Sequence, residues 1–260
     1  MLTNGLTGIN GLLLDLNGVF YVSNKAMSGA IETIDRLRSA GIPYRFATNT
    51  TTQSVQTMSQ DLQSMGLPID PADIISAPYA AVLHLRQMGR PKLYFLLAED
   101  AKQDFAEFPF SDTAADVVVV GDMCDEWNYP VLNRAFRLVM QGAQLMALHK
   151  GRFWQWEAGL QLDIGAFVAG LEYATDTEAL VVGKPNPFFF ETAAHALGMS
   201  PSEVAMVGDD IEADVAGAQG VGMKGVLVKT GKYRPDLAAK TGIIPDLELD
   251  AIADLSAHLG

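Results

Sequence analysis

Short runs of aliphatic residues alternate along this chain with longer segments of helical periodicity. The runs lie at residues 11–14, 44–47, 93–97, 117–120, 145–148, 180–182, 204–207 and 226–228. Several contain only aliphatic residues, which is typical of strands buried on both faces of a parallel sheet. Between them, apolar residues recur at helical spacing, as in Ile31, Ile34 and Leu37, with Ser28 as the expected cap. The alternation predicts an α/β fold.

Charge excludes several classes of function. The chain has 18 Lys and Arg against 31 Asp and Glu, a net charge of −13, which argues against nucleic acid and anionic membranes as partners. A small anionic substrate is still compatible with a locally positive site. One cysteine, Cys124, cannot form a disulfide framework. Because neither a signal peptide nor a membrane span is evident, we expect a cytoplasmic protein.

Polar residues follow four of the predicted strands. They are Asp15 after 11–14, Thr48 and Asn49 after 44–47, Lys184 after 180–182, and Asp209, Asp210 and Asp214 after 204–207. In open α/β sheets ligands bind at the carboxyl ends of strands, so we expect these side chains to share one crevice. Carboxylates suit Mg²⁺ and can act as nucleophiles, while a lysine and a threonine hydroxyl can bind phosphoryl oxygens.

Four short motifs in this order resemble those of the haloacid dehalogenase (HAD) superfamily. They are Asp15-Leu16-Asn17-Gly18-Val19, Thr48-Asn49, Lys184-Pro185 and Gly208-Asp209-Asp210. The stretches His149–Arg152 and Thr230–Lys232 resemble the NagD-like branch, and within it most closely the phospholysine phosphohistidine inorganic pyrophosphate phosphatase group. The resemblance implies a Rossmann-like, doubly wound parallel-sheet core with an inserted smaller α/β cap domain. It also implies a Mg²⁺-dependent phosphatase that acts on a small phosphorylated substrate, and it permits a homodimer.

The resemblance also implies a role for each motif residue. Asp15 would be the nucleophile and a Mg²⁺ ligand, and Asn17 would offer the metal its backbone carbonyl. Thr48 and Asn49 would bind the phosphoryl group, and Lys184 would hold its oxygens and orient Asp15. Asp209 would be the second metal carboxylate, with Asp210, and also Asp214, close to the metal.

Position 17 departs from the family pattern. Most HAD phosphatases have an aspartate there, which protonates the leaving group and later activates water, whereas this chain has Asn17. General acid–base help contributes about 10²–10⁴ in rate, and an amide cannot supply it. We therefore expect substrates with good leaving groups, namely phosphoramidates, pyrophosphate, acyl phosphates or aryl phosphates. The alternative is a catalytically impaired protein that binds phosphorylated ligands or a protein partner.

The insertion is predicted from length. Thr48 and Lys184 are 136 residues apart (184 − 48), far more than one crossover needs. We place a small α/β cap at 79–176 and the catalytic core at 1–78 plus 177–260. The resemblance implies that the cap closes over the strand ends and sets specificity. Arg152 follows a predicted cap strand and is a candidate contact for the substrate.

Two other activities compete with phosphate hydrolysis. A C–halogen hydrolase also uses an aspartate nucleophile, but it needs no metal, so Asp209 and Asp210 would have no purpose. A receiver-type signalling domain that stores aspartyl-phosphate would be shorter and would lack the insertion.

Overall fold

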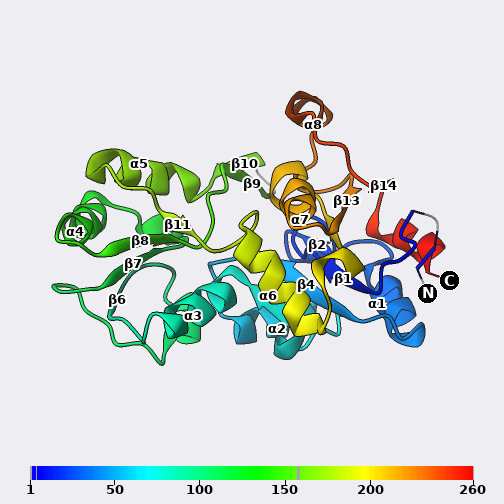
Figure 1. Cartoon of the computed structure of the whole chain (residues 1–260), viewed down its shortest axis with the longest axis horizontal. Helices are drawn as coiled ribbons and strands as arrows, with labels where there is room; N and C mark the ends of the chain where they lie inside the picture. Colours follow the sequence, from blue (N-terminus) through cyan, green and yellow to red (C-terminus); the bar gives the residue numbers. More distant parts are fainter. Residues whose placement is uncertain (1, 4, 157–158, 260) are drawn as a thin grey trace.

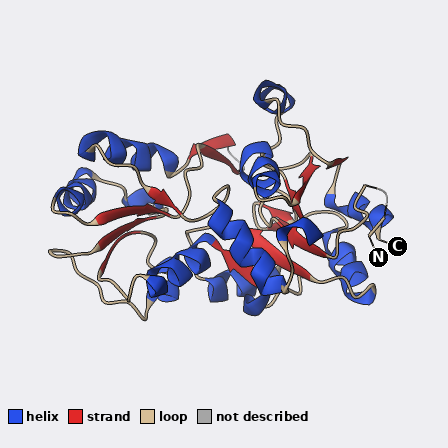
Figure 2. Ribbon diagram, viewed as in Figure 1, coloured by secondary structure: helices blue, strands red, loops and turns tan. Residues whose placement is uncertain are grey.

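The chain folds into two lobes, each built on its own β-sheet (Figures 1 and 2). A computed structural model describes residues 2–3, 5–156 and 159–259. The lobe that contains both ends of the chain is the core, and the lobe formed by the middle of the chain is the cap (Figure 1). The α/β fold with a parallel-sheet core and an inserted cap is therefore confirmed.

The core sheet has six parallel strands in the order β14-β13-β12-β1-β4-β5. Their bounds are β1 Gly11–Leu14, β4 Tyr44–Thr48, β5 Ile74–Ser76, β12 Val204–Gly208, β13 Lys224–Val228 and β14 Leu247–Leu249. Strand β1 lies between β12 and β4, and all of its residues are buried. The residue that follows β1 therefore emerges at the centre of the carboxyl edge.

Helices cover both faces of the core sheet. They are α1 Ala30–Ser39, α2 Val55–Ser64, α6 Pro187–Leu197 and α7 Gly217–Gly220. Helix α8 Pro235–Thr241 has no buried residue and projects from the core lobe (Figure 1). Leu12 and Leu14 pack on the face of α1 and α2, whereas Leu13 packs on the face of α6 and α7. Helix α1 is preceded by Gly29 at φ 78°, so the prediction that Ser28 caps it is wrong.

The cap sheet has four parallel strands in the order β11-β8-β7-β6. The strands are β6 Leu93–Leu96, β7 Val117–Val120, β8 Gln144–Ala147 and β11 Leu180–Val181, and the helices are α3 Ala77–Gln87, α4 Tyr129–Met140 and α5 Gly165–Thr175. Val117 and Val119 face α3, whereas Val118 and Val120 face α4 and α5. Because β11 pairs in this sheet, the cap pairing extends a few residues past 177, where the core was expected to resume.

The remaining elements are small. Two hairpins consist of β2 Tyr21–Val22 with β3 Lys25–Ala26, and of β9 Phe153–Trp156 with β10 Gly159–Leu162. Short helical turns are η1 Pro71–Asp73, η2 Ala101–Phe105, η3 Cys124–Glu126, η4 Pro201–Glu203, η5 Ile211–Ala216 and η6 Ile252–His258. Among the described residues, none of the helices has both the length and the apolar character needed to cross a membrane.

Asp104 links the two lobes. It lies in η2 of the cap, and its two carboxylate oxygens accept hydrogen bonds from the Val55 backbone N–H at 3.3 and 3.2 Å, at the start of the core helix α2. Burial, with a smaller contribution from the charge of Asp100, raises the pKa of Asp104 from 3.8 to about 6. The folded state therefore binds a proton at Asp104 more tightly than the unfolded chain does.

This raised pKa predicts a pH-dependent stability. The contribution of Asp104 is fully present below pH 3.8 and is lost as pH rises through 6, because the ionised carboxylate is then held partly away from water. Asp104→Asn keeps an acceptor for Val55 and removes that cost. We expect it to be more stable than the unaltered protein at pH 7, by about 1 kcal/mol after discounting for partial exposure. Urea unfolding between pH 4.5 and 7.5 checks this, and a difference that does not grow with pH contradicts it.

Candidate active site

Three carboxylates from two neighbouring strand ends meet at the centre of the core sheet. Asp15 follows β1, and its backbone N–H donates to Val207 O of β12 at 2.8 Å, which brings the two strand ends together. Asp209 follows β12, and Asp214 lies in the turn η5 just beyond. One oxygen of each carboxylate lies within 4.8 Å of the others, and all three side chains are buried.

Lys184 is the buried cation of this site. Its Nζ lies 2.6 Å from Asp15 Oδ1 and 2.7 Å from Asp214 Oδ1, and it donates to the Ala47 carbonyl at 2.8 Å. Only 3% of Lys184 is exposed. Burial alone would lower the pKa of Lys184, but Asp15 and Asp214 outweigh it and raise that pKa above its ordinary value. Asp15 and Asp214 therefore favour the charged ammonium, which is held against Asp15.

The site has more negative than positive charge. Burial, and then the charges of Asp15 and Asp214, raise the pKa of Asp209 well above its usual range. Burial raises the pKa of Asp214 to about 6 despite the opposing effect of Lys184. Crowded buried carboxylates take up protons when no other cation neutralises them. A cluster of oxygen donors with excess negative charge fits a hard divalent cation, which would displace those protons on binding.

Two glycines enclose the carboxylate of Asp209. Gly18 has φ +91° and Gly231 has φ +51°, and a Cβ at either position would overlap Asp209 Oδ2. The Lys232 backbone N–H donates to the same oxygen at 2.6 Å, and Thr230 Oγ1 donates to the Gly18 carbonyl at 2.5 Å. The turn after β1 and the segment after β13 therefore close on Asp209 from two sides.

The threonine and asparagine predicted to bind phosphoryl oxygens make different contacts. Thr48 is buried, and its Oγ1 lies 2.9 Å from Thr50 Oγ1 and accepts from Thr50 N. Asn49 exchanges two hydrogen bonds, both 2.9 Å, with the backbone of Lys184. Asn49 thus holds the Lys184 loop against the end of β4, a role that sequence reasoning did not foresee.

The other predicted residues lie around this centre. Asp210 is not part of the described carboxylate cluster: its Oδ1 accepts from the backbone N–H groups of Glu212 and Ala213 and so caps η5. Asn17 is half-buried in the turn after Asp15. Arg152 of the cap pairs with Glu212 of the core at 2.7 Å, with both side chains largely exposed.

Comparison with known proteins identifies the family. Residues 12–111 match the family described as haloacid dehalogenase-like hydrolase, and residues 181–255 match the HAD-hydrolase-like family. The human haloacid dehalogenase-like hydrolase domain-containing protein 2 is 41% identical over 252 residues, which cover 96% of each chain. This chain belongs to the haloacid dehalogenase-like hydrolases.

Two further comparisons agree with this assignment. The Danio rerio phospholysine phosphohistidine inorganic pyrophosphate phosphatase is 38% identical to this hydrolase, covering 97% of this chain and 93% of its own. The structure of a p-nitrophenyl phosphatase from Archaeoglobus fulgidus has a TM-score of 0.89 at 27% identity, covering 96% and 98% of the two chains. NagD from E. coli K-12 shares the fold, with a TM-score of 0.85 at 23% identity over 95% and 98% of the chains. The NagD-like resemblance inferred from the motifs is confirmed.

The enclosure of Asp209 gives a prediction about Gly18. In this hydrolase Gly18→Ala should destabilise the fold by a positive-φ cost of about 1 kcal/mol and by at least ~2 kcal/mol more, because its Cβ displaces the Asp209 carboxylate. Gly89→Ala is the matched control, since Gly89 has φ +86° with nothing within 4 Å of the added Cβ. Urea unfolding of both variants checks this, and equal losses would show that Asp209 is not confined there.

Proposed function

We propose that this hydrolase is a Mg²⁺-dependent phosphohydrolase that works through an aspartyl-phosphate on Asp15. The observation that carries the proposal is the contact of Lys184 with Asp15 inside a buried carboxylate cluster. A carboxylate nucleophile held beside a fixed ammonium suits attack on a phosphoryl group, because the ammonium offsets repulsion between two anions. The phosphatase names of two of the relatives support the same reaction class.

The carboxylate cluster fits Mg²⁺. Asp15 and Asp209 would hold it with their side chains and Asn17 with its backbone carbonyl, and Asp214 supplies a third carboxylate nearby. Asp210 remains a candidate ligand by resemblance, although its side chain caps η5. When bound, the ion would neutralise carboxylates and phosphoryl oxygens together.

The chemistry then proceeds in two steps on Asp15. A carboxylate oxygen bonds to phosphorus while the bond to the leaving group breaks, and the leaving group departs with that electron pair. A water oxygen next bonds to phosphorus, the bond to Asp15 breaks, and the proton lost by the water passes to solvent. Throughout, Lys184 neutralises phosphoryl oxygens, while Thr48 and Asn49 are the proposed hydrogen-bond donors.

Asn17 sets the substrate class in this proposal. Because the amide is too weak an acid to transfer a proton, the leaving group must depart as a stable species, as from a phosphoramidate, pyrophosphate, acyl phosphate or aryl phosphate. Arg152 at the cap would meet the leaving group after releasing Glu212. We also propose a cytoplasmic location, and the family resemblance permits a homodimer.

Phosphate release with and without Mg²⁺ tests the activity. We expect turnover of acetyl phosphate and p-nitrophenyl phosphate that a chelator removes, and Asp15→Asn should lower it at least ~10³-fold, because the nucleophile is lost. Asp112→Asn is the control, since Asp112 lies on the cap surface paired with Arg134. Turnover that survives Asp15→Asn contradicts the proposal. If there is no turnover but Mg²⁺-dependent binding of phosphate, the alternative of an impaired ligand-binding protein is supported.

Replacing the amide at position 17 tests the substrate class. Asn17→Asp should raise kcat for alkyl phosphates such as glycerol phosphate by about 10²-fold, because the leaving alkoxide gains a proton donor. The gain for p-nitrophenyl phosphate should be much smaller, since its leaving group needs no proton. The ratio of the two gains is the measurement, and equal gains would show that Asn17 does not select for leaving groups.

A further inference from the structure

The segment that joins β4 to α2 is bonded to the cap at its middle and at its end. This segment, residues 48–54, begins with Thr48, the last residue of β4, and Asn49. Thr51 Oγ1 accepts from the Asp122 backbone N–H at 3.0 Å, and Asp122 follows β7 of the cap. The Ser54 backbone N–H donates to Asp100 Oδ2 at 2.7 Å. Neither cap residue is close in sequence, so these bonds form only when the two lobes are docked.

The cap also supplies acceptors for the first turn of α2. The first N–H groups of a helix have no partners within it. Ser54 Oγ accepts from Thr57 N at 3.2 Å, which satisfies one of them. Asp104 of the cap accepts from Val55 N, and Asp100 Oδ1 accepts from Thr57 Oγ1 at 3.0 Å. The negative charge of Asp100 at the helix N-terminus also interacts favourably with the helix dipole.

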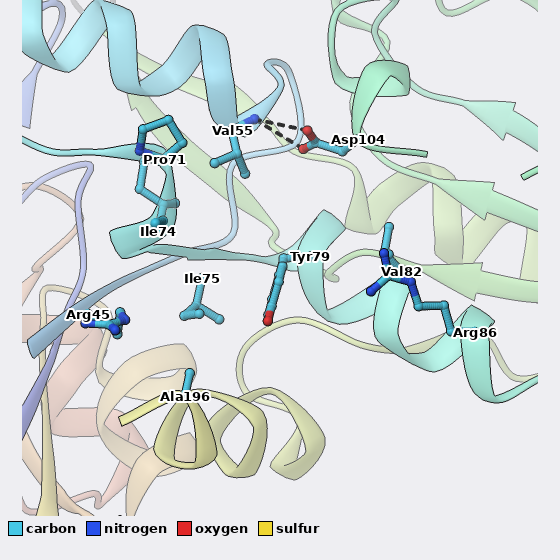
Figure 3. Close-up of a pocket in the computed structure, with 11 residues that line it drawn as sticks. Arg45, Val55, Pro71, Ile74, Ile75, Tyr79, Val82, Arg86, Asp104 and Ala196 are labelled. Atoms are coloured by element: carbon cyan, nitrogen blue, oxygen red, sulfur yellow. Dashed lines mark hydrogen bonds between the residues drawn. The ribbon is translucent and has the colours of Figure 1, made fainter. Parts of the chain in front are cut away.

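The start of α2 is not closely packed against the cap beside these hydrogen bonds. A cavity of about 350 Å³ lies beside them, lined by Val55, Ile75, Tyr79, Val82 and Asp104 among other residues (Figure 3). Figure 3 shows the Val55 N–H directed at both Asp104 oxygens at the edge of this cavity. The start of α2 is therefore held to the cap here by directional hydrogen bonds to carboxylates.

We propose that Asp100 and Asp104 are positioning residues, through which the cap sets the Thr48–Thr51 loop for phosphoryl binding. Thr50 N and Thr50 Oγ1 both contact Thr48 Oγ1, so a shift of α2 is transmitted along the loop to the hydroxyl at the strand end. The affinity of the site for phosphate then depends on how the cap lies on the core. This inference rests on the proposed function, since it assumes that the loop binds phosphoryl oxygens.

Asp100→Ala tests the inference in the full-length protein. We expect the KM for p-nitrophenyl phosphate and the inhibition constant for inorganic phosphate to rise together by about 10-fold, because hydrogen bonds to a charged acceptor are lost. The kcat should stay within about 2-fold, because Asp15 and Lys184 are untouched. Asp100→Asn keeps an acceptor for Ser54 and should restore most of the affinity. Asp112→Ala is the control, since Asp112 contacts only the cap in the described structure.

Amide hydrogen exchange makes the two proposals separable. In Asp100→Ala, or in Asp104→Ala should the first variant not fold, exchange should accelerate in residues 48–57 and remain unchanged in Asp112→Ala. Unchanged exchange in residues 48–57 overturns the inference whether or not the protein turns over any substrate. Faster exchange with an unchanged phosphate constant also overturns it. Lack of Mg²⁺-dependent turnover in the unaltered protein overturns only the proposed function.

Discussion

The contact of one buried ammonium with two carboxylates joins the parts of this site. Lys184 lies on the segment that returns from the cap, and its Nζ contacts Asp15 after β1, Asp214 in η5 and the carbonyl of Ala47 in β4. A buried charge is tolerated only when it is paired and hydrogen-bonded, so removing any partner leaves another charge uncompensated. The same contact that holds Asp15, the proposed nucleophile, therefore also fixes the meeting of three core strands with the returning chain.

The central part of the fold could be predicted because its strands are buried on both faces. The apolar runs at β7 and β12 are typical of such strands, and Asp15 directly follows the end of β1. The edge strands β5 and β14 have only three residues each and alternate or mix with polar positions, so no run marks them. The hairpins β2–β3 and β9–β10 were missed for the same reason. They lie outside the two buried sheets, so their position does not require a continuous apolar run.

The sequence was enough to predict most of the residues in the site, but not the contacts that each of them makes. Sequence reasoning placed Asp210 and Asp214 together near the metal, but Asp210 caps η5 while Asp214 turns back to Lys184. Spacing along the chain cannot distinguish these roles, since they depend on the widened helical turn at Ile211–Ala216. Asn49 illustrates the same limit, because its partner Lys184 is 135 residues away. Asp100 has no motif at all and is recognised only by its bond to Ser54.

The place of the insertion explains why the cap and the site are so closely connected. The chain enters the cap after β5, beside the strand that carries Thr48, and returns at Gly183, next to Lys184. The carboxyl ends of β7 and β8 meet the core there: Gly183 N donates to the Leu148 carbonyl at 2.8 Å, and a Cβ at Gly183 would overlap that carbonyl. A Cβ at Gly121 would likewise press on Leu97 of the cap and on Thr51 of the core. Because both approaches leave no room for a side chain, a movement of the cap toward the core at these points would press on the loops that carry Thr48 and Lys184.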